Sequence, residues 1–194
     1  MDASLVNQVV VAVATLLASL GGYLLAGLNE RHRDERTLDR ELRLRFAERE
    51  AQLDEDRHAL QRTTLLALQD ALQAEARFSG QVVHFDHMQA RQGEYTPLPD
   101  QLNDDSYANL VEVRRLTSRV LDSDVRDAVE RFIEISVRVS ILPEDLRGLS
   151  GDRLEDTASA KVVALNDGYL AVSCVVGEAV RREIAWHPSE RAAL

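Results

Sequence analysis

The clearest pattern along the chain is an uncharged apolar run near its N-terminus, residues 9–28, VVVAVATLLASLGGYLLAGL. At 1.5 Å per residue a helix of this run is roughly 30 Å long, the thickness of the hydrocarbon core of a bilayer. A cleaved signal peptide needs a basic segment and a shorter apolar run, and a buried core helix is rarely apolar on every face. The pattern therefore predicts a retained transmembrane helix, with those two as the alternatives.

Residues 29–59 have the opposite pattern, dense in charge and free of glycine and proline. Acidic residues precede basic ones by four positions, as at Asp39 and Arg43, an order that favours helix. One heptad seam is apolar, at Phe46, Leu53, Leu60 and Ala67. The second seam is polar, whereas a stable coiled coil needs both to be apolar. The pattern predicts a solvated helical stalk that continues the span, with a weak parallel coiled coil as the alternative.

From Leu60 onward, apolar residues recur every three or four positions, which is the period of an amphipathic helix. The first helix is expected to continue to about Arg91, and Ser79-Gly80 is the expected place for a kink. A loop follows at 93–99, because its two prolines disfavour helix at their own and the preceding positions.

Capping residues divide the rest of the chain into further helices. The second helix is expected to begin at one of three good N-caps, Asp104, Asp105 or Ser106. Its core face would carry Tyr107, Leu110, Val113, Thr117 and Val120. A third helix follows the cap sequence 122–124 and ends at Pro143. Its core face would carry Val125, Val129, Phe132, Ser136 and Val139.

The last element has two interpretations. Apolar residues keep a helical spacing at Leu154, Ala158, Val162, Leu165, Tyr169, Val172, Val176, Ala179 and Ile184. The turn sequence Asn166-Asp167-Gly168 between two apolar runs also fits a β-hairpin over 160–176. Because a lone hairpin is marginally stable in water, one long helix is favoured, and Gly168 costs it roughly 1 kcal/mol.

These elements predict an all-α protein with an N-terminal transmembrane helix that continues into a long stalk helix, followed by an antiparallel bundle of about four helices. The expected parts are an anchor at 1–28, a charged stalk at 29–59, a bundle at 60–186 and a tail at 187–194. Trp186 is expected to pin the last helix to the bundle, with a partner surface as the alternative.

Charge indicates the orientation of the anchor. No lysine or arginine precedes Arg31, and seven arginines lie from Arg31 to Arg49. The positive-inside rule counts such residues, so the N-terminus is expected outside the cell membrane and residues 29–194 in the cytoplasm. The net charge of −10 argues against nucleic acid as a partner, because phosphate binding needs a basic surface.

Few residues suggest chemistry. His84 and His87 lie one helical turn apart, but a zinc site needs a third ligand that the sequence does not indicate. Glu55 and His58 form a single Glu-x-x-His motif, whereas di-metal bundles use two. Cys174 lies in an apolar stretch and is expected to be a buried, inert thiol. No catalytic residue, cofactor or metal is expected, and the protein is expected not to be an enzyme.

Ala14, Ala18, Gly22 and Ala26 recur every four residues within the predicted span. Small residues at this spacing let two helix backbones approach closely in a membrane. They are therefore the expected helix–helix contact of a homo-oligomer. The alternative is that they reflect the abundance of alanine in the chain.

The segment YANLVEVRRLTSRVLDSDVRDAVERFIEISVRV, residues 107–139, resembles uncharacterised single-pass membrane proteins of high-GC bacteria. Those proteins have a short N-terminal span, an Arg-rich stalk helix and a small helical bundle, and the resemblance extends loosely over the whole chain. It implies the architecture predicted above, and it implies no reaction and no functional residues.

The span, the stalk and the bundle together predict a membrane-tethered interaction or scaffold protein, whose partners are the lipid bilayer and another protein. The alternative is a membrane effector that acts through oligomerised transmembrane helices, as in defence against phage. A metal-binding module that uses His84 and His87 is the third hypothesis.

Overall fold

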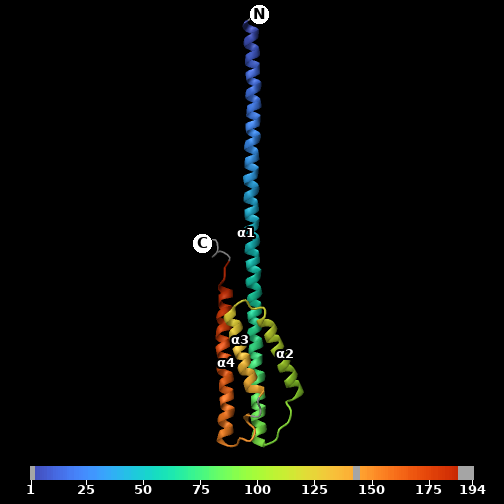
Figure 1. The fold of residues 1–194 in the computed structure, drawn as a ribbon, viewed down its shortest axis with the longest axis vertical. Helices are drawn as coiled ribbons and strands as arrows, with labels where there is room; N and C mark the ends of the chain where they lie inside the picture. The colour runs from blue at the N-terminus through green and yellow to red at the C-terminus, as the bar shows by residue number, and fades with distance from the viewer. Residues whose placement is uncertain (1–2, 142–144, 188–194) are drawn as a thin grey trace. The chain divides into compact units, whose positions relative to one another are not determined.

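The computed structural model describes residues 3–141 and 145–187, with side chains described at 14–23, 37–140 and 145–187. These residues form helices and connecting turns, without strands. The α-helices among them are α1 (Ala3–Gln92), α2 (Asp100–Thr117), α3 (Ser123–Ile141) and α4 (Asp152–Ala185) (Figure 1). The prediction of an all-α protein is confirmed, and α4 excludes the hairpin.

Two compact units make up the chain, Met1–Leu53 and Asp54–Leu194. Helix α1 supplies the described residues of the first unit and continues into the second. The large apolar side chains described in the first unit are all exposed: Leu16, Leu17, Leu20, Tyr23, Leu38, Leu42, Leu44, Phe46 and Leu53. The predicted span at 9–28 lies within α1, and its side chains at 9–13 and 24–28 lie outside the described residues.

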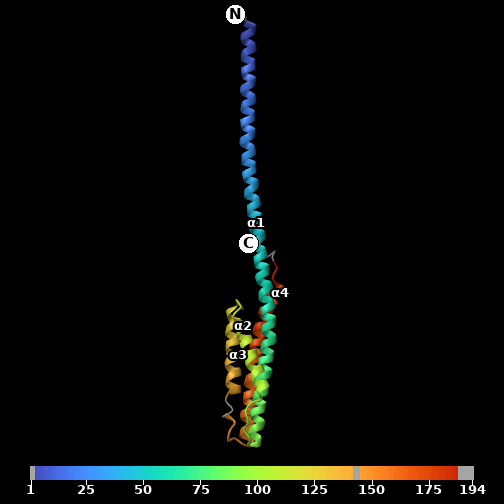
Figure 2. The same ribbon diagram turned by 90° about the vertical axis from the view of Figure 1, so that its right-hand side faces the viewer.

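The second unit is a helical bundle of the C-terminal part of α1 with α2, α3 and α4. Successive helices run in opposite directions (Figures 1 and 2). The main core includes Leu65, Leu68, Leu72, Val83, Val113, Leu116, Val125, Val129, Phe132, Ile133, Leu165, Val172 and Val176. The core positions of each helix recur about every three or four residues, so the amphipathic period places them on one face.

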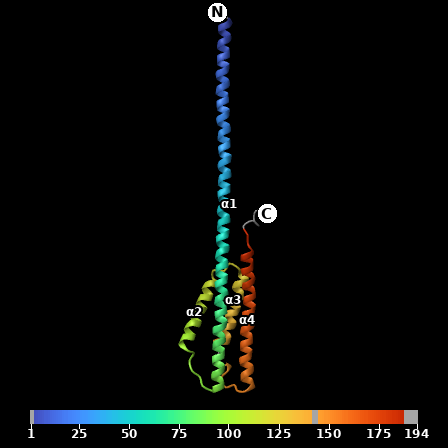
Figure 3. The same cartoon turned by 180° about the vertical axis from the view of Figure 1, so that it is seen from behind.

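Helices α3 and α4 lie side by side (Figures 1 and 3), and Gly168 is the point of their close approach. A Cβ atom at Gly168 would lie 2.9 Å from Cδ1 of Ile135 and 3.5 Å from Cδ2 of Phe132. Because an unstrained Cβ contact is longer than 3 Å, the glycine allows this approach. Helix packing therefore explains the glycine that also fitted a hairpin turn.

Two helix boundaries follow the predicted signals. Helix α1 ends at Gln92, and Gly93 follows with a φ of 69°, the left-handed conformation that glycine adopts most easily. Asp122 caps α3, because its Oδ1 accepts hydrogen bonds from the backbone N–H groups of Asp124 at 2.9 Å and Val125 at 3.3 Å. The cap sequence 122–124 is thus confirmed.

The predicted start of α2 at 104–106 is wrong. The helix begins at Asp100, directly after Pro99, and has no side-chain cap. The backbone N–H of Asn103 donates to the carbonyl oxygen of Pro99 at 3.1 Å. Pro99 occupies the N-cap position with an extended backbone (φ −54°, ψ 131°), and the helix begins directly after it, before the better N-cap residues.

Three residues predicted to face the core are exposed: Tyr107, Val162 and Ile184. The face of α4 that packs against the bundle is narrower than the apolar face of the helix. Val162 and Ile184 lie on the apolar face but beyond the packed part, so they are exposed. Tyr107 lies on the part of α2 that diverges from the bundle (Figure 3). The expected kink at Ser79-Gly80 does not interrupt α1, which is helical through both residues.

Candidate functional site

The histidine pair predicted from the sequence lies on α1 without forming a metal site within the described residues. His84 is exposed, whereas Nε2 of His87 lies 3.2 Å from Oε2 of Glu155, without hydrogen-bond geometry. Glu155 also pairs with Arg91 at 3.4 Å. No described group of three His, Cys, Asp or Glu residues is placed to hold a metal ion. His87 is therefore a contact between α1 and α4.

His58 makes a contact that its Glu-x-x-His spacing did not indicate. Its Nδ1 lies 2.5 Å from Oε2 of Glu183 on α4, and its ring stacks on Trp186 with centroids 4.0 Å apart. Glu55, the other residue of the motif, is exposed. Trp186 thus pins the C-terminal end of α4 to the bundle, as predicted.

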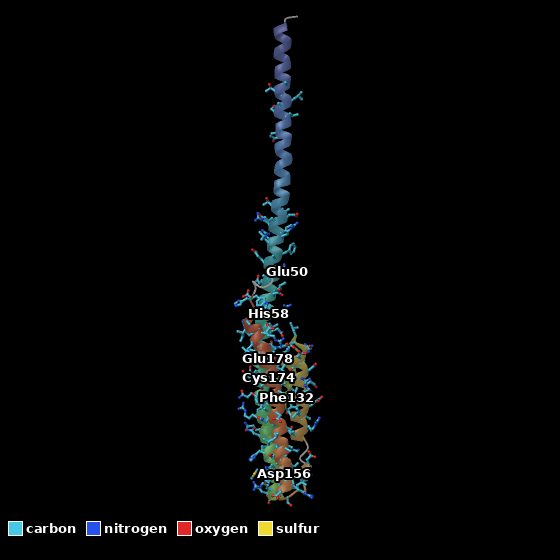
Figure 4. The ribbon with its side chains drawn as sticks, turned by 90° about the vertical axis from the view of Figure 1, so that its left-hand side faces the viewer. Glu50, His58, Phe132, Asp156, Cys174 and Glu178 are labelled. Atoms are coloured by element: carbon cyan, nitrogen blue, oxygen red, sulfur yellow. The ribbon has the colours of Figure 1, made fainter. Side chains whose placement is uncertain are left out.

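Cys174 is exposed, so the prediction of a buried thiol is wrong. Val172 and Val176, two residues to either side, are buried, and residues two apart on a helix do not share a face. The Sγ atom lies 3.9 Å from Oε1 of Glu178, one turn further along α4 (Figure 4). The apolar sequence around Cys174 therefore supplies an outer face of α4 as well as its core face.

The small-residue stripe predicted in the span is only partly described. Ala14, Ala18 and Gly22 are exposed, and a Cβ at Gly22 would meet no atom within 4 Å. The side chain of Ala26 lies outside the described residues. The helix–helix contact through this stripe stays a prediction.

An apolar surface lies on the side of α4 away from the core. Its exposed residues are Ala160, Val163, Ala164, Leu170, Ala171 and Cys174, here called the α4 outer face. Val163 and Leu170 are 54% and 57% exposed, and Asp167 lies between them. Within the described residues, α4 is the one helix long and apolar enough to cross a membrane, yet only 28% of its most apolar stretch is buried.

A buried polar network lies where α1, α2 and α3 meet. Glu75 of α1 is 3% exposed. Its Oε1 accepts a hydrogen bond from Oγ of Ser136 at 2.8 Å, and its Oε2 accepts one from Nδ2 of Asn109 at 2.9 Å. Oγ of Ser79 lies 2.6 Å from Oγ of Ser136. Because each hydroxyl has one proton, these short contacts form a chain from Ser79 through Ser136 to Glu75.

A cavity of about 200 Å³ adjoins this network. Its polar lining comprises Glu75, Asn103, Ser106, Tyr107, Ser136 and Ser140. Figures 1 and 3 show the reason for the space: α2 diverges from the bundle toward its N-terminal end. Only Val113 and Leu116, near the C-terminal end of α2, are buried within that helix. The cavity therefore lies under the loosely packed half of α2.

Glu75 has no positively charged partner among the residues that line the cavity, which include no Lys, Arg or His. A second buried carboxylate, Asp86, is different. Burial raises the pKa of Asp86, and the charges of Lys161 and Arg147 lower it only in part. Asp86 thus lies in the field of two cations, whereas the hydrogen-bond partners described for Glu75 are neutral.

Sequence reasoning missed Glu75, and one signal could have found it. Leu68, Leu72, Glu75, Ser79 and Val82 follow one another at three- or four-residue spacing on α1. That spacing puts Glu75 and Ser79 on the core face, and an acid at a core position is a candidate for a polar function. Asn109 offered no comparable signal, because its role depends on which helix lies opposite.

The chain matches no protein-family model, no curated protein and no solved structure. Two features of the described residues bear on its function, the α4 outer face and the cavity at Glu75.

Proposed function

We propose that the protein is a membrane-tethered helical interaction protein, a scaffold rather than an enzyme. Residues 9–28 hold it in the cell membrane with the N-terminus outside, and the bundle lies in the cytoplasm. The bundle binds a partner protein through the α4 outer face. The exposure of that face is the observation that carries the proposal.

The shape of the α4 outer face suits an apolar helix of a partner. Val163 and Leu170 are seven residues apart and so lie on one line along the helix. Small side chains flank them at Ala160, Ala171 and Cys174, which allows a second helix to approach closely on either side of the carboxylate of Asp167. Burying apolar surface contributes roughly 25 cal/mol per Å², so covering this face favours association.

A partner protein explains this face better than insertion of α4 into lipid. The opposite face of α4 carries Val172 and Val176, which are fully buried against the rest of the bundle. Moving α4 into a membrane would expose to water the core residues of α1 and α3 that pack against it. A partner helix covers the outer face and leaves the core intact.

Site-specific photo-crosslinking in cells tests the contact. A crosslinking amino acid at Val163 or Leu170 of the full chain is expected to give a discrete product with one protein. The matched control places it at Gln73, an exposed polar position on α1, and should give none. Leu170→Glu should abolish the product from Val163 and leave the melting temperature of the bundle unchanged. Equal products at Val163 and Gln73 would contradict the proposed surface.

Protease access to a C-terminal tag tests the anchor separately. The tag should stay with alkaline-washed membranes and should be cut only after spheroplasts are lysed. Cleavage in intact spheroplasts would reverse the orientation, and release by the alkaline wash would contradict the anchor.

A further inference from the structure

We propose that the cavity between α1, α2 and α3 binds a small organic cation, whose ammonium group pairs with the carboxylate of Glu75. This inference is independent of the α4 outer face, because the residues that line the cavity include none of α4.

The first argument is charge. Removing an ionised carboxylate from water is costly unless it is both hydrogen-bonded and paired with a positive charge. Ser136 and Asn109 supply hydrogen bonds to the two oxygens of Glu75, but they supply no charge. The cavity adjoins the carboxylate, and its lining contains no basic residue. A cationic ligand in the cavity is the partner that completes the site.

The second argument is the nature of the walls. Beyond the polar floor, the cavity is lined by Val82, Leu98, Leu102, Leu110 and Val137. A ligand with one charged end and an apolar body matches this division. Pockets for drug-sized ligands are about 300–1,000 Å³, so a cavity of about 200 Å³ suits a shorter molecule, such as an alkylammonium ion of a few carbons.

A metal ion suits the site less well than an amine. Calcium takes six to eight oxygen ligands, and magnesium requires a near-ideal octahedron of oxygen ligands that includes several waters. Glu75 is the one carboxylate in the lining. The apolar walls would contribute nothing to a metal ion, whereas they would contact the chain of an alkylammonium ion.

Helix α2 provides the way in. Its N-terminal half holds one wall of the cavity, and Tyr107, which is 70% exposed, lies at the rim. The bond from Asn109 to Glu75 joins this helix to the carboxylate itself. A ligand that binds Glu75 therefore lies next to the hydrogen bond that links α2 to α1.

Calorimetric titration of the full chain in detergent micelles with n-butylammonium chloride tests the inference. We expect saturable binding with one ligand per chain, and at least about tenfold weaker binding of 1-butanol, which has the same chain without the charge. Glu75→Gln should weaken butylammonium binding by about tenfold or more, since it removes the charge and keeps the size. Glu134→Gln, an exposed change on α3, is the matched control and should bind like the parent chain.

Leu110→Trp gives a second test, because it fills the cavity and leaves Glu75 in place. It should also abolish binding, so the inference stays testable if Glu75→Gln does not fold. Equal binding by the Glu75→Gln and parent chains would overturn the inference. So would equal binding of butanol, tighter binding of magnesium or calcium, or no saturable binding of any primary amine from methylammonium to hexylammonium.

Discussion

Helices α2 and α4 both belong to the bundle, but they are held in different ways. Helix α4 buries eight of its 34 residues, among them Val172 and Val176, whereas α2 buries two of its 18. Helix α4 meets α3 through apolar side chains and a glycine at close approach. Helix α2 meets α1 through the amide of Asn109. One helix thus packs along its length through apolar contacts, and the other covers a cavity.

The two ends of α2 repeat this difference within one helix. At its C-terminal end, the side chain of Gln61 donates to the carbonyl oxygen of Arg119 and accepts from the N–H of Leu121, both at 2.9 Å. At its N-terminal end, α2 follows Pro99 without a side-chain cap. Helix α2 is thus held more firmly at its C-terminal end than at its N-terminal end.

The largest expected difference in stability is between substitutions of two aromatic residues, Phe132 and Tyr107. Phe132→Ala should lower the free energy of unfolding by about 3–5 kcal/mol, because it leaves a hole in the α3–α4 core. Tyr107→Ala on α2 should change it by about 0.5 kcal/mol or less, since that side chain is exposed. Urea unfolding of both variants measures the difference. Similar losses would show that α2 is packed as firmly as α4.

Removing the polar link between α2 and α1 should have a smaller effect. Asn109→Ala leaves Oε2 of Glu75 without its donor, which should cost about 1–3 kcal/mol. Amide hydrogen exchange should rise in α2 and stay slow in α3 and α4. Gln101→Ala, an exposed change on the same helix, is the control. Equal protection of α2 in both variants would show that the amide does not hold the helix.

Substitutions of Asp122 test how the C-terminal end of α2 is held, because this residue lies in the turn between α2 and α3 that contacts α4. Its Oδ2 lies 2.5 Å from Nη2 of Arg182. Burial by itself raises the pKa of Asp122, but hydrogen bonds from the Val125 N–H, the Arg182 side chain and the Asp124 N–H outweigh burial and lower the pKa overall.

A lowered pKa in the folded state means that the ionised form of Asp122 stabilises the fold. This contribution is present above the unfolded pKa of about 3.9 and is lost as the pH falls through the lower folded value. Asp122→Ala should cost about 1 kcal/mol at pH 7 through loss of the cap. Asp122→Asn should keep most of the cap and reduce the loss of stability below pH 4. A parent-like acid profile for Asp122→Asn would rule out this role.

The smallest effects compare two glycines of α4. At Gly168 an added Cβ meets Ile135 at 2.9 Å, whereas at Gly177 its nearest neighbour is the end of the Arg181 side chain at 3.5 Å. Gly177→Ala should stabilise the bundle by about 0.5–1 kcal/mol through helix propensity. Gly168→Ala should lose about 1 kcal/mol net, because overpacking exceeds that gain. Thermal unfolding of the two variants measures whether each gains or loses stability. A gain in stability for Gly168→Ala would disprove the close approach of α3 at that residue.

Much of the fold could be predicted from local patterns. The three-to-four spacing identified the helices of the bundle, α2, α3 and α4 among them, and Val125, Val129, Phe132, Ser136 and Val139 of the predicted core face of α3 are buried. The end of α1 and the cap of α3 were also readable, because Gly93 and Asp122 act within a few residues of their own positions. The start of α2 was not predicted, because the good N-cap residues at 104–106 indicated a later start than the one observed directly after Pro99.

The candidate sites were harder to predict because they depend on neighbours distant in sequence. Cys174 and Val162 lie in an apolar sequence, and only the narrow contact of α4 with the bundle leaves them exposed. Glu75 gained its role from Asn109 and Ser136, which lie 34 and 61 residues further along the chain. No local pattern specifies such a distant pairing.

The sequence by itself determined which segments are helical and which faces are apolar, because helix propensity, capping and periodicity act over one or two turns. The tertiary structure decided which apolar face is buried, since that depends on the helix opposite. It also decided that the two halves of α2 differ, and so where a cavity remains. Gly168 shows both contributions. The sequence supplies a residue without a side chain, and the tertiary structure makes that absence necessary, because Ile135 approaches the backbone there.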